Sequence, residues 1–127
     1  MDLAASATDA ATLYAGTETG LLVSRDGGKS WQAAYLLKRP VSMVRTVEGG
    51  VIYAFVVGSG LIRASEKNLS WSTLGNGFGG AYVLHLAVDP TDKNRLYAAT
   101  FDPASHKGDV LGSADGGRTW SAYGAGR

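Results

Sequence analysis

The chain has 127 residues, a formal net charge of +1 and no cysteine. Disulfide frameworks and thiolate chemistry are therefore excluded. Because no basic or acidic block is present, capture of nucleic acid or of an anionic membrane surface by charge is not expected. Glycine is the outlier, with 18 residues where an average composition of about 7% would give half as many. This glycine indicates turns between many short strands.

The length predicts a single domain, and an apolar content of 45% is sufficient for a core. No apolar run approaches the length of a membrane-spanning segment. The N-terminus lacks a basic stretch followed by an apolar run, so no signal peptide is visible. A cytoplasmic location is the default expectation, and secretion stays open if a leader was removed.

Three successive units of four short strands are predicted. The first unit comprises 3–9, 12–17, 20–26 and 30–35. The second comprises 42–48, 51–57, 60–66 and 70–75, and the third comprises 83–89, 95–101, 109–115 and 119–124. The segments are rich in β-formers and bounded by Gly, Asp, Asn or Pro, and none keeps a helical apolar period. Such quartets are typical of propeller blades. The predicted fold is all-β, with three four-stranded antiparallel blades over 3–35, 42–75 and 83–124.

One motif recurs between the third and fourth strands of every unit. SRDGGKSW occupies 24–31, SADGGRTW occupies 113–120, and ASEKNLSW at 64–71 is a degenerate copy. Each copy follows a Tyr-Ala pair and ends in a tryptophan, with spacings of 40 and 49 residues: Trp31, Trp71 and Trp120. Self-similarity at this period indicates a repeat architecture.

The frame Ser-x-Asp-x-Gly-x-Thr/Ser-Trp has a physical role in its turn. The Asp can accept hydrogen bonds from its own turn, the Gly permits a positive φ, and the Trp is expected to fold back and be buried between blades. In the second unit Asn68 replaces the Gly and is expected to tolerate the left-handed region. The residues assigned this structural role are Ser24, Asp26, Gly28, Trp31, Glu66, Trp71, Ser113, Asp115, Gly117 and Trp120.

The two intact copies resemble Asp-boxes, also called BNR repeats, at every defining position. The resemblance covers essentially the whole chain and implies blades like those of sialidases, xyloglucan-active glycoside hydrolases, sortilin-type receptors and photosystem II assembly factors. The third unit, with AVDPTDKNRLYAATFDP before its box, is most similar to the second and fourth groups. In these families the box is structural and lies opposite the ligand site, which implies a site on the opposite rim here.

Three blades do not close a ring, because propellers have about four to eight. Two blade faces would be left open to water. The simplest closure is a homodimer with twofold symmetry, in which the third unit of each chain packs on the first unit of the other to give six blades. The alternative is that the residues belong to a longer propeller.

The rim opposite the boxes is formed by the loops that join second to third strands and fourth strands to the next unit. Loops on a rigid scaffold concentrate binding residues, and FDPASHKG at 101–108 is the longest and most polar of its kind. Aromatic and polar groups together suit a sugar or a peptide, although such residues also occur in ordinary surface loops. The ligand-binding candidates are Lys38, Arg39, Phe78, Tyr82, Phe101, Asp102, His106 and Lys107.

Two further polar residues fall on predicted inner strands and are not repeated between units. Arg45 either lines the central channel or is satisfied by carbonyl groups between blades. His85 is expected to be hydrogen-bonded in the core. Two distant histidines do not indicate a metal site, and the box turns lack the distal Glu of an EF-hand loop. No metal and no cofactor is therefore expected.

Glycoside hydrolysis requires two carboxyl groups about 5–10 Å apart. The rim offers Glu18, Asp102 and Asp109, and pairing of Asp102 with Glu18 or with its own symmetry mate is open. Nothing marks these groups as catalytic, and Arg39-Pro40 lacks the spacer of the sialidase Arg-Ile-Pro element, so no catalytic residue is assigned. The sequence favours a non-catalytic module that binds a glycan or a partner protein. The alternatives are a sialidase-like or xyloglucanase-like hydrolase and a fragment of a longer propeller enzyme.

Overall fold

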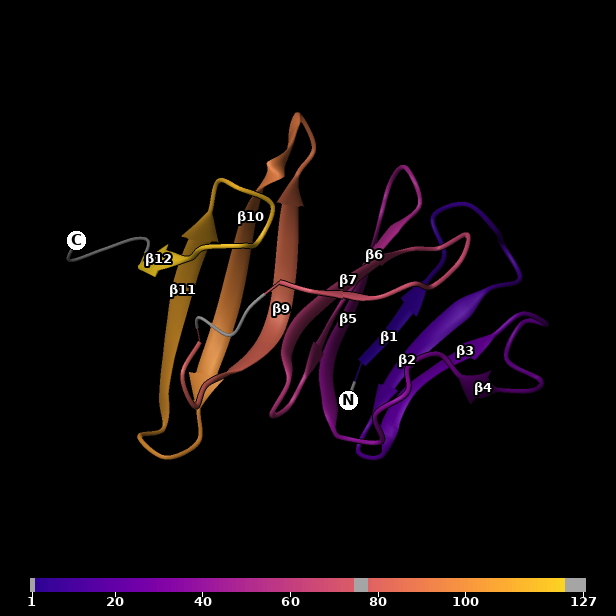
Figure 1. The fold of residues 1–127 in the computed structure, drawn as a ribbon, viewed down its shortest axis with the longest axis horizontal. Coiled ribbons are helices and arrows are strands. Elements are labelled where there is room, and N and C mark those ends of the chain that lie inside the picture. Colours follow the sequence, from indigo (N-terminus) through magenta and orange to yellow (C-terminus); the bar gives the residue numbers. More distant parts are fainter. Residues whose placement is uncertain (1, 75–77, 123–127) are drawn as a thin grey trace.

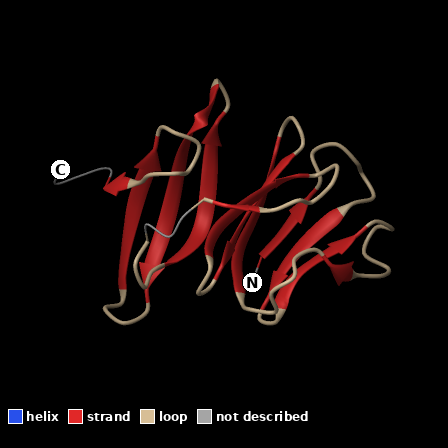
Figure 2. Cartoon of the chain, viewed as in Figure 1, coloured by secondary structure: helices blue, strands red, loops and turns tan. Residues whose placement is uncertain are grey.

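The computed structural model describes residues 2–74 and 78–122, and this part of the chain is built from strands and turns without a helix (Figure 2). No helix within it could therefore span a membrane. The strands of the first sheet are β1 (Asp2–Ala5), β2 (Leu13–Thr17), β3 (Gly20–Ser24) and β4 (Gln32–Ala33). Those of the second are β5 (Val41–Val47), β6 (Val51–Val56), β7 (Gly60–Ser65) and β8 (Ser72–Thr73). Those of the third are β9 (Tyr82–Asp89), β10 (Asp92–Asp102), β11 (Lys107–Ser113) and β12 (Ser121–Ala122).

Each sheet is a four-stranded antiparallel meander in which every strand pairs with its sequence neighbours. We call the sheets blade 1 (β1–β4), blade 2 (β5–β8) and blade 3 (β9–β12). The three blades stand side by side, and the first strands of successive blades, β1, β5 and β9, are in contact (Figure 1). The predicted all-β architecture of three four-stranded blades is thus what the chain forms.

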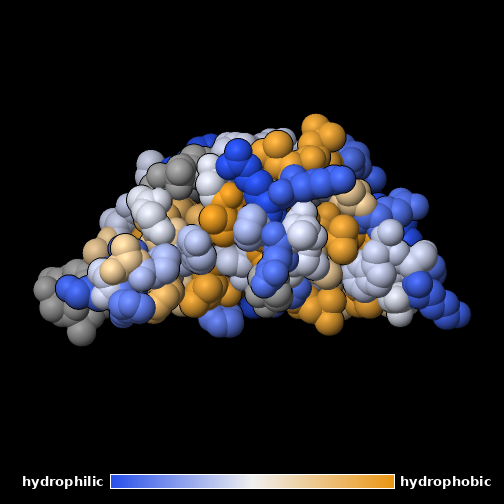
Figure 3. Space-filling model, turned by 90° about the horizontal axis from the view of Figure 1, so that it is seen from below, coloured by the Kyte–Doolittle hydropathy of each residue, from blue (hydrophilic) through white to orange (hydrophobic). Residues whose placement is uncertain are grey.

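The turns divide between two rims. The lower rim in Figure 1 carries the β2–β3, β6–β7 and β10–β11 turns, and the upper rim carries the β1–β2, β5–β6 and β9–β10 turns together with the repeated motif. Seen from below, the molecule has one nearly straight edge and one arched edge (Figure 3). This half-disc outline is expected for three blades that fan about a common axis.

The core lies in the two joints between blades. Because side chains alternate along a strand, each blade presents a leading face to the preceding blade and a trailing face to the next. The joint between blades 1 and 2 buries Tyr14, Leu21 and Val23 against Val44, Ile52, Ala54 and Ile62. The joint between blades 2 and 3 buries Met43, Tyr53, Phe55 and Leu61 against Val83, Leu86, Leu96 and Ala98. Strand β6 is buried on both sides, which explains its unbroken apolar sequence.

The fourth strands are shorter than predicted. Each pairs over only two residues, so Trp31, Trp71 and Trp120 precede the strand instead of lying in it. The chain stays in the turn of the repeated motif as far as the tryptophan. Only the residues after the tryptophan pair with the third strand. The last residues of two predicted strands, 75 and 123–124, lie outside the described part.

The expected burial of all three tryptophans is wrong for Trp31. Trp71 and Trp120 pack against the two joints, but Trp31 keeps 37% of its side chain exposed. It lies on the leading face of blade 1, near Leu13, where no other blade of the described chain can cover it. Leu3, on the same blade, is 64% exposed. A tryptophan of this motif is therefore buried by the neighbouring blade and not by its own turn.

The degenerate motif of blade 2 does not form the predicted turn. Glu66 is buried, with 7% exposure, and its carboxylate accepts hydrogen bonds from the Tyr14 hydroxyl at 2.9 Å and from the Ala7 backbone N–H at 3.3 Å. It therefore ties blade 2 to blade 1. Burial and the Glu66 hydrogen bond raise the pKa of the Tyr14 phenol, which stays a donor. The positive φ falls on Leu69, at 48°, and not on Asn68.

Candidate functional site

The two intact motifs, 24–31 and 113–120, form the same hydrogen-bonded turn, which we call a box turn. In the first, the Ser24 hydroxyl donates to Asp26 at 2.9 Å and accepts from the Gly28 N–H at 2.8 Å. Asp26 also accepts from the Ser30 N–H at 2.9 Å and from the Ser30 hydroxyl at 2.6 Å. The Trp31 indole donates to the Gly28 carbonyl at 3.1 Å. Each of these residues thus takes part in hydrogen bonds within its own turn.

The second box turn repeats this network with Ser113, Asp115, Gly117, Thr119 and Trp120. In both turns the carboxylate is occupied by donors from its own hairpin. The motif is therefore structural on the upper rim, and its aspartates offer little to a ligand.

These hydrogen bonds predict an acid-sensitive fold. Donation by Ser30, then by Ser24 and Lys29, lowers the pKa of Asp26 from 3.8 to about 2, and the equivalent bonds lower the pKa of Asp115. A carboxyl with a depressed folded pKa contributes stability that is present above its unfolded pKa and is lost as pH falls through the folded value. Thermal midpoints should therefore drop between about pH 3.8 and 2.

Thermal melts of Asp26→Asn would check this expectation. The variant should melt lower than the parent at neutral pH, and the difference should shrink in acid. Glu18→Gln, at an exposed position of the β2–β3 turn, is the control. Equal pH dependence in parent and Asp26→Asn would contradict the role assigned to the box turns.

Most predicted ligand-binding residues of blade 3 come together on the lower rim. On one side of β10, Phe101 lies opposite Tyr82 of β9. On the other side, Asp102 lies opposite Lys107, and this pair closes the β10–β11 hairpin. The rings of Phe101 and His106 meet edge to face, with centroids 6.3 Å apart. Phe101 and Asp102 are half-buried, and the other hairpin residues are exposed. We call Tyr82, Phe101, Asp102, His106 and Lys107 the hairpin cluster.

The hairpin holds its cluster in a defined shape. The Asp102 carbonyl accepts from the His106 N–H at 2.8 Å, and its carboxylate accepts from the Ala104 N–H at 2.9 Å. His106 has φ at 58°, a left-handed conformation that is uncommon outside glycine. Strain of this kind is often found at functional sites, so the hairpin fits a binding role.

Lys38 and Arg39 lie elsewhere on the lower rim. Both are exposed in the loop between blades 1 and 2. The Arg39 guanidinium lies so close to Gly58 of the β6–β7 turn that a Cβ there would meet it at 2.6 Å. Pro40 then accepts a hydrogen bond from the Val57 N–H at 2.8 Å. These residues are anchored at blade 2, away from the hairpin cluster of blade 3.

Phe78 is not a rim residue, contrary to the prediction. It is buried in the joint between blades 2 and 3, where its ring contacts Phe55 at 5.6 Å and Trp120 at 5.3 Å between centroids. The preceding predicted loop residues, 75–77, lie outside the described part. A glycine-rich segment with one aromatic residue indicated exposure, whereas Phe78 itself packs in the core.

The first strands of the three blades, β1, β5 and β9, line a hollow of about 400 Å³. Arg45 and His85 both line it, together with Asp2 and Met43, and both are exposed. The expectation that His85 belongs to the core is wrong, because β9 is the edge strand of blade 3 and the His85 side chain is exposed beside this hollow. Within the described residues, no group of three or more acidic, histidine or cysteine side chains is placed to hold a metal.

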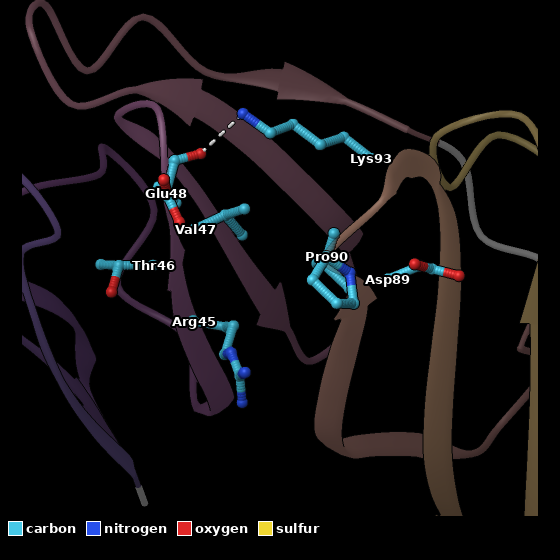
Figure 4. A pocket seen from close by; sticks show the side chains of 8 residues that line it. Arg45, Thr46, Val47, Glu48, Asp89, Pro90 and Lys93 are labelled. Carbon is cyan, nitrogen blue, oxygen red and sulfur yellow. Dashed lines mark hydrogen bonds between the residues drawn. The ribbon is translucent and has the colours of Figure 1, made fainter.

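A second concavity of about 220 Å³ lies on the upper rim between blades 2 and 3. Lys93, near the start of β10, crosses one side and donates to the Glu48 carbonyl at 3.0 Å. Arg45 extends along the opposite side, with Val47 and Pro90 between them (Figure 4). We call this concavity the joint pocket. Sequence reasoning missed Lys93, which no motif marks.

Sequence reasoning also missed an apolar groove of about 430 Å³ on the outer flank of the joint between blades 1 and 2. Tyr35 and Trp71 meet there edge to face, with centroids 5.9 Å apart, and the Trp71 indole donates to the Ala34 carbonyl at 2.7 Å. Leu36 beside them is 94% exposed. The groove also includes Lys38, one of the predicted candidates.

The sequence matches no family model and no curated protein. The solved structures that share its fold include the following two. YCF48 from Cyanidioschyzon merolae aligns over 96% of this chain and 36% of its own, with 21% identity and a TM-score of 0.68. The GH74 enzyme of Niastella koreensis aligns over 96% of this chain and 18% of its own, with 22% identity and a TM-score of 0.65.

Both of these structures are propeller proteins, and the predicted propeller-blade fold is therefore confirmed. The chain spans little more than a third of the length of YCF48 and less than a fifth of the length of the GH74 enzyme. At this identity the likeness establishes architecture alone.

Proposed function

We propose that the chain is a non-catalytic binding module that uses its lower rim to bind a glycan or a partner protein. The observation that carries the proposal is the hairpin cluster, in which two aromatic residues, a histidine and the register partners Asp102 and Lys107 lie at the lower-rim end of β9, β10 and β11. Aromatic surface beside a few fixed polar groups is the usual composition of a ligand site. The box turns of the opposite rim have their polar groups occupied within their own hairpins.

The lower rim is chemically mixed, as such a site requires. Apolar residues form several separate groups there, set between hydrophilic ones (Figure 3). Sugars are bound by rings that cover their C–H faces and by polar groups that reach their hydroxyls, and exposed peptide segments are held by the same combination. The fold likeness is consistent with either ligand, because the neighbours include a GH74 enzyme and YCF48.

Phe101→Ala and His106→Ala are expected to abolish binding on a glycan array probed with labelled protein. Both side chains lie at the lower-rim end of blade 3, so the thermal midpoint of unfolding should change little. Tyr82 packs against the joint between blades 2 and 3, so Tyr82→Phe tests its hydroxyl without opening the core. Lys29→Met, on the first box turn, is the matched control and should bind as the parent does.

The opposite pattern would overturn the assignment. If Lys29→Met lost binding while Phe101→Ala kept it, the site would lie on the box-turn rim. If the array gave no signal, the same variants would be compared in a pull-down of partner proteins. Retention by Phe101→Ala there would end the proposal.

Hydrolysis by a carboxylate pair within one chain receives no support from the geometry. Glu18 belongs to the β2–β3 turn and Asp102 to the end of β10, and Figure 1 places these turns at opposite ends of the blade row. Asp102 also has its carboxylate in the hairpin itself. A closed ring would bring the two turns together only between different copies.

We further propose that a second copy of the chain completes the ring. Blade 1 leaves its leading face open, with Trp31 and Leu3 exposed, and blade 3 leaves Val110 44% exposed on its trailing face. In the two internal joints, the leading face of one blade packs on the trailing face of the blade before it. The two open faces, the leading face of blade 1 and the trailing face of blade 3, are therefore of the types that pack together. Two half-discs joined along their straight edges give a full disc (Figure 3), and twofold symmetry satisfies both faces at once.

A further inference from the structure

The last strand of blade 1 leaves backbone groups open at the edge of its sheet. In the described chain, β4 is the outermost strand of blade 1. The Ala34 N–H donates to the Leu21 carbonyl at 2.8 Å. Hydrogen-bonded pairs alternate with non-hydrogen-bonded pairs in an antiparallel ladder, so the neighbouring pair, Ala33 with Leu22, is of the second kind. The N–H and the carbonyl of Ala33 therefore point away from β3.

The apolar groove on the outer flank begins at this edge. Ala33 and Ala34 line it from blade 1, and Leu69 and Trp71 line it from blade 2. Leu36, also in the lining, is 94% exposed. The volume of about 430 Å³ lies within the range of roughly 300–1,000 Å³ that is usual for ligand pockets. Seen from below, hydrophobic residues gather on the arched edge of the molecule next to strongly hydrophilic ones (Figure 3).

The polar groups of the groove are few, and their charge is positive. Among the described residues of the lining, Lys38 is the only charged one, and its side chain is exposed. The Trp71 indole already donates to the Ala34 carbonyl. A glycan needs several polar groups to reach its hydroxyls, whereas the side chains here offer the Lys38 ammonium and the Tyr35 hydroxyl. An apolar ligand with a negative charge is therefore the better match.

We infer that the groove is a docking site for an extended, acidic and apolar peptide segment of a partner protein, which adds a strand to the edge of blade 1. One residue of the segment exchanges hydrogen bonds with Ala33 and places its apolar side chain in the groove, and a neighbouring acidic residue pairs with Lys38. In strand addition, main-chain hydrogen bonds supply affinity and side-chain pockets supply specificity. The site lies on the outer flank and is separate from the hairpin cluster.

The test is a titration of the full chain with synthetic peptides, followed by backbone NMR. The probe is the acetylated and amidated pentapeptide Glu-Val-Leu-Val-Glu. Three matched peptides are Lys-Val-Leu-Val-Lys, Glu-Ser-Ser-Ser-Glu, and the probe with its leucine N-methylated. The probe should give saturable shifts at 32–36 and 69–71. The serine and N-methyl peptides should bind about tenfold more weakly, and the basic peptide about fivefold more weakly, as expected for exposed charges.

Variants assign the contacts within the protein. Ala33→Pro removes the outward N–H without removing a hydrogen bond to β3, and proline is tolerated on edge strands. It should weaken the Kd of the probe by about tenfold, whereas Ala33→Ser, which keeps the N–H, should bind as the parent does. Lys38→Glu should exchange the preference between the acidic and the basic peptide. Lys29→Met, on the box turn of the same blade, should change neither affinity.

Four outcomes would overturn the inference. The first is the absence of saturable shifts with the probe up to its solubility limit, and the second is equal binding of the N-methylated peptide. The third is an unchanged preference for the acidic peptide in Lys38→Glu. The fourth is a set of shifts at 32–36 and 69–71 that appears without peptide as protein concentration rises, which would assign the groove to a second copy of the chain.

The design does not depend on the proline variant. Amide spectra show directly whether Ala33→Pro folds. If it does not, the N-methylated peptide tests the same strand pairing from the side of the ligand, in the unaltered protein.

Discussion

Replacing Trp71 or Trp120 by alanine is expected to lower the free energy of unfolding by about 3–5 kcal/mol, the usual loss for a large aromatic residue in a core. Trp71 contacts Tyr35 and donates to the Ala34 carbonyl across the joint. Trp120 contacts Phe78 in the other joint. Trp31→Ala should lose only about 1 kcal/mol in the single chain, because exposed positions contribute little.

Urea melts of the three variants, followed by circular dichroism at low protein concentration, measure the three losses in the free energy of unfolding. Trp71 belongs to the degenerate motif, yet its contacts across the joint predict a larger loss than at Trp31, which is more exposed. An equal loss at Trp31 and Trp71 in a monomeric sample would contradict the blade contacts described above.

In solution the chain is expected to have twice the 13.2 kDa mass of one copy, because a closed ring of six blades covers both open faces. Light scattering coupled to size exclusion measures the mass. Trp31→Glu places a charge on the leading face of blade 1 and should give a folded monomer. Leu36→Glu, at a 94% exposed position on the outer flank, should leave the dimer intact.

A monodisperse, folded monomer at micromolar concentration would contradict closure by a second copy. Further blades from a longer form of the same chain would then be the candidate covering. If the dimer forms, Trp31→Ala should become more destabilising as protein concentration rises, since folding and association are linked. This concentration dependence distinguishes burial by a partner from burial within one chain.

The repeats made the fold predictable from sequence. A box turn fixes where a hairpin reverses. The three copies of the motif, each following a Tyr-Ala pair, place four strands in every unit. These signals are local, and local hydrogen bonds such as those of Asp26 follow from residue types a few positions apart. The sequence therefore predicts the hairpins and their order well.

Contacts between blades were less predictable, because they depend on residues far apart in the chain. Glu66 occupies a box position yet bonds to Tyr14 in another blade. Phe78 sits in a glycine-rich loop yet packs in a joint. The joint pocket is lined by both Arg45 of β5 and Lys93 of β10, and no motif marks either residue.

The strict order of strand pairing bears on how the molecule folds. Every strand pairs with its sequence neighbour, and the two buried clusters join successive blades. Such connectivity keeps loop closures short and favours rapid folding, with stability divided between units and nearest-neighbour interfaces. Blade 2 takes part in both interfaces, so its unfolding uncouples blades 1 and 3, whereas loss of either end blade leaves one interface in place. Cooperativity in this chain therefore depends on its middle third.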